Sequence, residues 1–71
     1  MPKTPRLTAS EVIKQLIAAG FVEVGQTGSH RKLFQPDTRK TTIVPIHGNK
    51  ILPIGTLKAI EKQSGIKFLH S

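Results

Sequence analysis

Three residues with chemically useful side chains stand together in the segment TGSHRKLF, which spans residues 27–34. They are His30, Arg31 and Lys32, and they follow a glycine and a serine. Histidine titrates near neutral pH, so it can take a proton from a hydroxyl or give one to a leaving oxygen. Neighbouring cations can stabilise the negative charge that develops on a phosphate in such a reaction. This trio therefore indicates proton transfer at a phosphate ester.

Other kinds of active site do not fit the residues present. Ser29 and His30 are sequence neighbours on a predicted strand and would point to opposite faces, so they do not form a nucleophile and its base. His30 and His47 without an acid make a poor zinc site. The acids are far apart along the chain, which makes a carboxylate cage for Mg²⁺ unexpected: Glu11, Glu23, Asp37 and Glu61. We therefore expect chemistry without a metal or a cofactor. If the histidine takes its proton from a ribose 2′-hydroxyl, the substrate must be RNA, because DNA lacks this group.

The composition sets further bounds. Eleven Lys and Arg against four Asp and Glu give the 71-residue chain a formal charge of +7. These cations are spread along the whole chain, which favours a folded basic face that binds a polyanion. Cysteine is absent, and no apolar run approaches the roughly 20 residues of a membrane span. We expect a single cytoplasmic domain over residues 1–71, with a flexible stretch at 1–7.

A first helix is predicted to begin at about Ala9. Thr8 and Glu11 have the spacing of a capping box, in which each side chain satisfies a free backbone amide of the first turn. Gly20 is placed to end the helix in a left-handed conformation. The apolar residues repeat at helical spacing and are expected on one buried face: Val12, Ile13, Leu16 and Ile17.

Three short segments with β-type patterns follow, at residues 21–26, 29–35 and 41–47. The turns between them are predicted at 27–29 and 36–39, so the strands should form an antiparallel meander. Pro45 cannot donate a ladder hydrogen bond, which indicates an edge strand or the end of a strand.

A second helix is predicted over residues 57–64. Thr56 is expected to cap it and Gly65 to end it. Leu57 and Ile60, with Ala59 beside them, would form its apolar face. The last residues keep three apolar side chains and should partly pack back onto the core: Ile66, Phe68 and Leu69.

The predicted order is α-β-β-β-α, an α+β fold. Both helices can share a core with a three-stranded antiparallel sheet only if they cover the same face, which leaves the other face open. This is the layout of double-stranded-RNA-binding domains. Strict alternation leaves two arrangements of the central strand. If Leu33 is buried, His30 and Lys32 lie on the open face with Phe34 beside them; if Phe34 is buried, His30 turns inward.

The assembled pattern resembles the HicA family of toxin ribonucleases from toxin-antitoxin pairs. The most specific part is Gly28-Ser29-His30 just after the helix-strand opening. A second part is Val44-Pro45 followed by His47, and then Gly55-Thr56-Leu57 at the last helix. The family often has an aromatic residue three positions after the histidine, where this chain has Leu33. That correspondence favours Leu33 as the core residue and His30 on the outer face.

The resemblance implies cleavage of messenger RNA by a catalytic histidine that maps to His30. It also implies a HicB-like antitoxin that binds the toxin and blocks the site. We expect RNA to contact a set of residues around this histidine and in the loop after the third strand: Gly28, Ser29, Arg31, Lys32, Phe34, His47 and Lys50.

Two other functions remain open from the residues alone. One is a non-catalytic RNA-binding module, which would hold duplex RNA by shape and phosphate contacts. The other is a basic face that serves mainly to hold an acidic protein partner. His70, next to the C-terminus, is not expected to take part in either.

Overall fold

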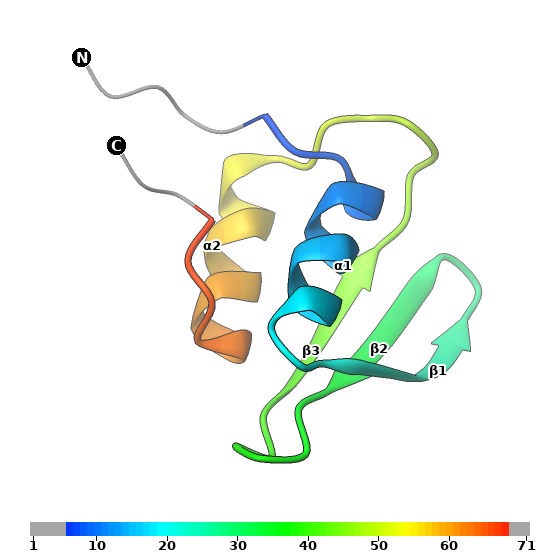
Figure 1. Ribbon diagram of the computed structural model, residues 1–71. Coiled ribbons are helices and arrows are strands. Elements are labelled where there is room, and N and C mark those ends of the chain that lie inside the picture. Colours follow the sequence, from blue (N-terminus) through cyan, green and yellow to red (C-terminus); the bar gives the residue numbers. More distant parts are fainter. Residues whose placement is uncertain (1–5, 69–71) are drawn as a thin grey trace.

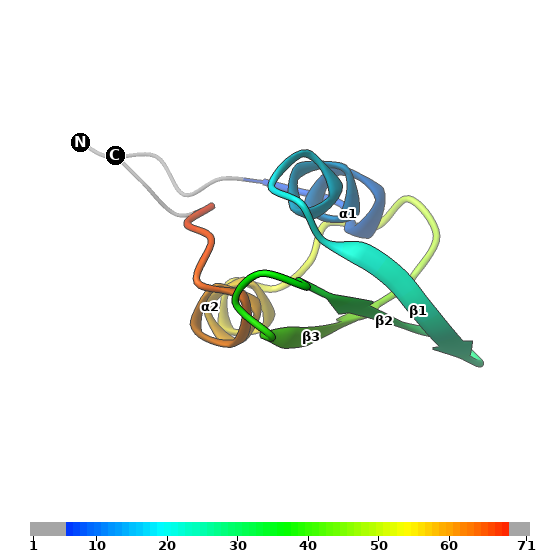
Figure 2. The ribbon, with the colours of Figure 1, turned by 60° about the horizontal axis from the view of Figure 1, so that its bottom comes forward.

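The structure is a computed structural model that describes residues 6–68. Its elements follow the predicted order α-β-β-β-α. They are α1 (Ala9–Ala18), β1 (Val22–Thr27), β2 (His30–Phe34), β3 (Thr41–Pro45) and α2 (Ile54–Ser64). The strands form one antiparallel meander in the order β1-β2-β3, so β2 is central and β3 is an edge strand that ends at Pro45. The two helices lie on one side of this sheet (Figures 1 and 2). The predicted α+β fold is confirmed.

The first helix begins as predicted. The backbone N–H of Thr8 donates to Glu11 Oε1 at 2.9 Å, and the N–H of Glu11 donates to Thr8 Oγ1 at 3.3 Å. The Thr8 N–H and the Thr8 hydroxyl, which donates to the same Oε1 at 3.1 Å, lower the pKa of the Glu11 carboxyl from its ordinary value. Ile17, however, is 51% exposed, so its expected burial is wrong. The turn after the helix brings the N–H of Phe21 to the carbonyl oxygen of Leu16, and Phe21 is buried at this end of the core instead.

The second helix begins earlier than predicted. Pro53 is its N-cap, and its carbonyl oxygen accepts the N–H of Leu57 at 3.1 Å. Thr56 therefore lies within the first turn and does not cap the helix. Pro53 itself has the extended ψ of 150° that precedes a helix, and no side-chain hydrogen bond caps this end. The predicted end at Gly65 is confirmed, with φ at +76°. Ala59 is exposed and not part of the apolar face.

The core lies between the two helices and the sheet. Its fully buried side chains come from every element except β1. The main members are Val12, Leu16, Phe21, Leu33, Val44, Leu52, Leu57, Ile60 and Phe68. Figure 1 shows the β1–β2 hairpin extending past the helices, and all six residues of β1 are exposed. The hairpin is therefore held mainly by its pairing within the sheet.

Two glutamines fasten the helices to the sheet. Gln35, at the end of β2, donates from Nε2 to the carbonyl oxygen of Ala19 at 2.8 Å, which satisfies a free carbonyl at the end of α1. Gln63 of α2 accepts at Oε1 from the buried hydroxyl of Thr42 at 2.9 Å. The same Oε1 also accepts the N–H of Ile43 at 3.4 Å, which pairs a backbone group of the β3 edge.

Both ends of the described chain pack on this body. Phe68 is buried, and its N–H donates to the carboxylate of Glu61, so the predicted packing of the tail is confirmed for this residue. Leu69 lies outside the described residues. Leu7 packs against the core, and its carbonyl oxygen accepts the N–H of Leu52 at 2.8 Å. Leu7, the last residue of the stretch expected to be flexible, is therefore in contact with the core, and residues 1–5 lie outside the described part.

Candidate functional site

The central strand decides which face carries His30. Leu33 is fully buried against the helices. Because strand side chains alternate, His30, Lys32 and Phe34 lie on the other face, and His30 and Lys32 are exposed there. Of the two arrangements that the sequence allowed, the one with Leu33 in the core is confirmed. The open face thus presents an imidazole and an ammonium group two residues apart, about 7 Å along the strand.

A bulge in β1 shapes the surface beside these two side chains. Glu23 pairs with Leu33, but the next pair is Gly25 with Lys32, so Val24 is an extra residue between them. A bulge of this kind shifts the following residues to the other face. Gly25 therefore stands on the open face next to Lys32, in the position that Val24 would occupy in an unbroken ladder.

Because glycine has no side chain, this part of the open face is hollowed. The hollow has a volume of about 150 Å³ and is lined by Gly25, Gln26, Thr27, His30, Lys32 and Ile43. Thr27 pairs directly with His30, and Ile43 pairs directly with Lys32. The side chain of Lys32 makes no hydrogen bond or ion pair with any other residue in the described range 6–68. Its ammonium group is thus available to an anion that approaches His30.

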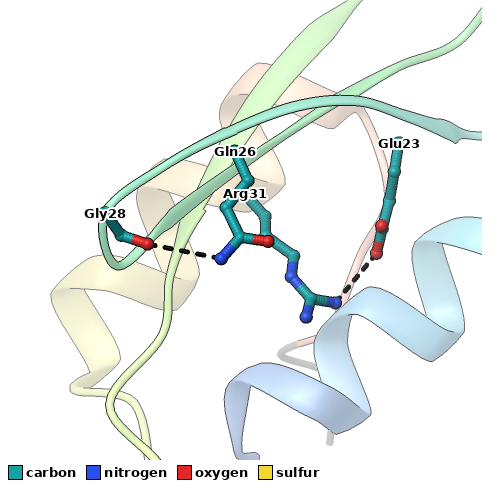
Figure 3. Close-up of polar contacts among 4 residues, drawn as sticks. All are labelled: Glu23, Gln26, Gly28 and Arg31. Carbon is teal, nitrogen blue, oxygen red and sulfur yellow. Dashed lines mark hydrogen bonds and ion pairs between the residues drawn. The ribbon is translucent and has the colours of Figure 1, made fainter.

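Arg31 lies on the opposite face, under α1. Its Nη1 is 3.0 Å from Glu23 Oε1, and its side chain is only 38% exposed (Figure 3). The Nε atom is buried and has no hydrogen-bond partner among the described residues. The sequence grouped Arg31 with His30 as an RNA-contacting residue, but alternation separates them. The guanidinium is paired with the Glu23 carboxylate on the helix side, so Arg31 does not lie beside His30 on the open face.

Gly28 and Ser29 form a two-residue turn between β1 and β2. Gly28 has φ at +57°, which is the conformation that such hairpins require at their first central position. Its carbonyl oxygen accepts from Gln26 Nε2 at 3.4 Å (Figure 3). The carbonyl oxygen of Ser29 accepts the N–H of Ile46, which extends the pairing of β2 and β3 by one residue. The turn is thus fixed at both sides next to His30.

The other expected contact residues lie at different distances from His30. His47 follows Ile46 directly and is exposed, so it lies near the hairpin turn. Lys50 lies farther along the same loop, in a turn that its own N–H closes by donating to His47 O at 3.2 Å. Phe34 is half-buried on the open face at the far end of β2, about 13 Å along the strand from His30. It is too far away to contact the same nucleotide.

Four residues of the hollow were missed by sequence reasoning: Gly25, Gln26, Thr27 and Ile43. A glycine inside a strand pattern indicates a bulge or close approach to a ligand, so Gly25 could have been noticed from the sequence.

Within the described range, no group of three His, Cys, Asp or Glu side chains is arranged to hold a metal ion. No helix between residues 6 and 68 is long and apolar enough to cross a membrane.

One known protein family matches the sequence. A family model described as "HicA toxin of bacterial toxin-antitoxin" matches residues 9–66. The chain belongs to the HicA toxin family. The match covers every helix and strand, including the hairpin with His30 and the bulge. This HicA family member is therefore a toxin of a toxin-antitoxin system. No curated protein matches the sequence closely enough to add a relative.

Proposed function

We propose that this HicA family toxin is an endoribonuclease that cleaves messenger RNA, with His30 as the reacting side chain. The observation that carries the proposal is the position of His30. It is exposed on the open face of the sheet, at the rim of a hollow that Lys32 also lines. An RNA strand can reach the imidazole there without any movement of the core.

The reaction is an internal transesterification. Neutral His30 accepts the proton of a ribose 2′-hydroxyl, and the resulting oxygen attacks the adjacent phosphorus. The P–O2′ bond forms and the P–O5′ bond breaks, and the leaving 5′-oxygen takes up a proton from water. The products are a 2′,3′-cyclic phosphate and a 5′-hydroxyl. The proposed step uses no metal ion.

Lys32 is the cation best placed to assist this step. It stands on the same face as His30, two residues away, and its ammonium group has no partner among residues 6–68. A positive charge at this distance stabilises the extra negative charge on phosphorus as the pentacoordinate species forms. Arg31 does not serve this role, because Glu23 holds it on the helix side.

The formal charge of +7 supports RNA as the substrate, because it draws a polyanion to the whole surface. Gly28 and Ser29 form the hairpin turn next to the proposed reacting group, and His47 and Lys50 lie in the loop after β3. We assign these residues to contacts with the RNA backbone on either side of the cleaved bond.

We further propose that a HicB-like antitoxin neutralises the toxin by covering the open face. Exposed apolar side chains stand on or beside this face, among them Val22 at 46% and Ile43 at 47% exposure. Basic residues such as Lys32 lie between them. A partner with an apolar centre and acidic groups would complement this surface and exclude RNA from His30.

Cleavage of RNA in the presence of a chelator tests the proposed activity. We expect the purified wild-type protein to cleave messenger RNA with EDTA present and to leave 2′,3′-cyclic phosphate ends. The His30→Ala variant should be folded, by circular dichroism and thermal unfolding, and should not cleave. His70→Ala is the matched control, because it removes another histidine of the same chain; it should cleave like the wild type. Undiminished cleavage by folded His30→Ala would refute the role of His30.

Expression in cells gives a second readout of the same proposal. Wild-type toxin produced alone should arrest growth, and His30→Ala should be tolerated. Co-production of a HicB-like protein encoded beside the toxin should restore growth. If the purified wild-type protein binds RNA but never cleaves it, the function is that of an RNA-binding module and the ribonuclease proposal is wrong.

A further inference from the structure

We propose that the hollow at Gly25 is a binding site for one unpaired base of the RNA substrate. This inference rests on the proposed ribonuclease function and adds a substrate subsite to it. The occupant is a single nucleotide of an RNA strand, with its base in the hollow and its sugar or phosphate at His30.

The hollow results from a specific departure from regular strand structure. In an unbroken ladder, Val24 would stand beside Lys32 and its side chain would fill this space. The bulge between Glu23 and Gly25 brings Gly25 to that position instead. Bulges are enriched next to active sites, where they redirect side chains. Here the effect is to remove a side chain from the surface beside His30.

The volume of the hollow sets the size of the occupant. Pockets that enclose whole small ligands have volumes of about 300–1,000 Å³. A hollow of about 150 Å³ is smaller, and so it suits one flat ring that belongs to a larger molecule. A base within a duplex is stacked and paired, and it cannot enter such a space. Unpaired bases of single-stranded RNA can be splayed out and bound individually.

The lining also suits a base. The backbone of Gly25 and the side chain of Ile43, which is 47% exposed, offer apolar surface against which a ring can lie. Thr27 stands directly opposite His30 and carries a hydroxyl that can hydrogen bond to a base edge or a ribose oxygen. Lys32 lies between Gly25 and Ile43 in the sheet and can pair with the phosphate of the same nucleotide.

The position of the hollow links base binding to cleavage. Its six lining residues include His30, so a base held there keeps its own sugar-phosphate unit within reach of the imidazole. Binding the base would therefore align the reacting bond, which is one of the larger contributions an enzyme can make to rate. The same contact would select which nucleotide is cut.

Filling the hollow tests the proposal without disturbing the fold. Gly25 is not in a left-handed conformation, and a Cβ added there meets no heavy atom within 4 Å. Gly25→Val should therefore fold, and valine is also a better strand residue than glycine. Gly55→Val is the matched control. Gly55 likewise has open space around its Cβ position, but it lies in α2, on the helix side of the sheet.

The binding probe is a short single-stranded oligonucleotide whose riboses are 2′-O-methylated, so that it cannot be cleaved. Fluorescence anisotropy measures its affinity, and an unmodified RNA of the same sequence reports cleavage. We expect Gly25→Val to bind about tenfold more weakly, which corresponds to the loss of roughly one base-stacking contact. Its cleavage of the unmodified RNA should fall at least as much. Gly55→Val should match the wild type in both assays, and Gly25→Val should unfold at the wild-type temperature or above.

Other outcomes would overturn the proposal. Wild-type affinity and cleavage in folded Gly25→Val would show that the hollow holds no base. Wild-type affinity with lost cleavage would show that valine disturbs His30 and not a bound nucleotide. If Gly25→Val does not fold, Gly25→Ala is measured in its place, and wild-type affinity in this variant would overturn the proposal. A wild-type protein that cleaves no RNA would refute the ribonuclease function itself. If the wild type cleaves RNA and Gly25→Val has the same affinity and cleavage rate, only the proposed base-binding site is refuted.

Discussion

The two faces of the sheet carry different properties, although the same strands build both. On the helix face, Leu33 and Val44 are completely buried. On the open face, His30, Lys32 and Ile43 are exposed. Since neighbouring residues of one strand point to opposite faces, a single substitution can alter stability or the proposed chemistry separately. The core and the candidate site of this small toxin therefore share strands but are built from different side chains.

The largest expected effect is on the helix face. Leu33→Ala should lower the free energy of unfolding by about 2–5 kcal/mol, because it leaves a cavity in the centre of the core. Ile43→Ala, on the neighbouring strand but on the open face, should cost less than about 1 kcal/mol. Urea unfolding followed by circular dichroism measures both. Equal losses of unfolding free energy in the two variants would contradict the proposed difference between the two faces.

A smaller effect is expected where α2 is fastened to β3. Gln63→Ala removes the acceptor of the buried Thr42 hydroxyl and of the Ile43 amide. The loss should be about 1–2 kcal/mol of unfolding free energy, since a buried hydroxyl is then left without its partner. Gln15→Ala, on the exposed side of α1, is the control and should change stability by less than about 0.5 kcal/mol. A Gln63→Ala protein as stable as this control would show that the contact contributes nothing.

Arg31 and Lys32 are adjacent cations on opposite faces of the sheet, so their substitution should have different effects. Arg31→Met should cost only about 0.2–1 kcal/mol of stability, the usual contribution of an exposed ion pair, and should leave RNA affinity nearly unchanged. Lys32→Met should leave stability unchanged and weaken RNA binding. It should also reduce the slope of log affinity against log salt concentration by about one, as expected when one phosphate contact is lost. If Arg31→Met weakened RNA binding and Lys32→Met did not, the RNA would bind on the helix side of the sheet.

The smallest expected effect concerns the start of α1. The hydrogen bonds from Thr8 lower the pKa of Glu11 in the folded protein below the ordinary value of 4.5. Ionised Glu11 therefore stabilises the fold at pH values above 4.5, and this stabilisation is lost as the pH falls through the folded pKa. Unfolding free energies measured from neutral pH downward should fall less for Glu11→Gln than for the wild type. Parallel curves for the two proteins would contradict the role of the capping box.

Local signals predicted most of the fold. The capping box of Thr8 and Glu11, the helix end at Gly65 and the strand end at Pro45 each act within a few residues, so the sequence reveals them directly. The meander followed from two short turns. Thr56 was wrongly assigned as the N-cap because the helix already begins after Pro53, which has no side chain that could form a capping hydrogen bond. Ile17 was misassigned because Phe21 fills the end of the core, which helical periodicity alone does not show.

The candidate site was only half predictable. His30 stands out by residue type, but its face depended on whether Leu33 or Phe34 enters the core, which only tertiary packing decides. The position of Gly25 depends on the register of β1 against β2, and a one-residue bulge changes it. Arg31 was grouped with Lys32 because the two are adjacent in sequence. Their separation follows from strand alternation and from the ion pair with Glu23, which forms across strands.

The most direct test of the open face as the RNA-binding surface uses isoleucine methyl groups. Ile43 is exposed on the open face, Ile17 on α1 and Ile54 on α2, so one label reports on three surfaces. The NMR experiment adds the 2′-O-methylated oligonucleotide to methyl-labelled His30→Ala protein. We predict that the Ile43 methyl signal shifts on binding, while the Ile17 and Ile54 signals stay in place. Shifts at Ile17 and Ile54 with an unchanged Ile43 would show that RNA binds across the helices, and would contradict the assignment of the open face.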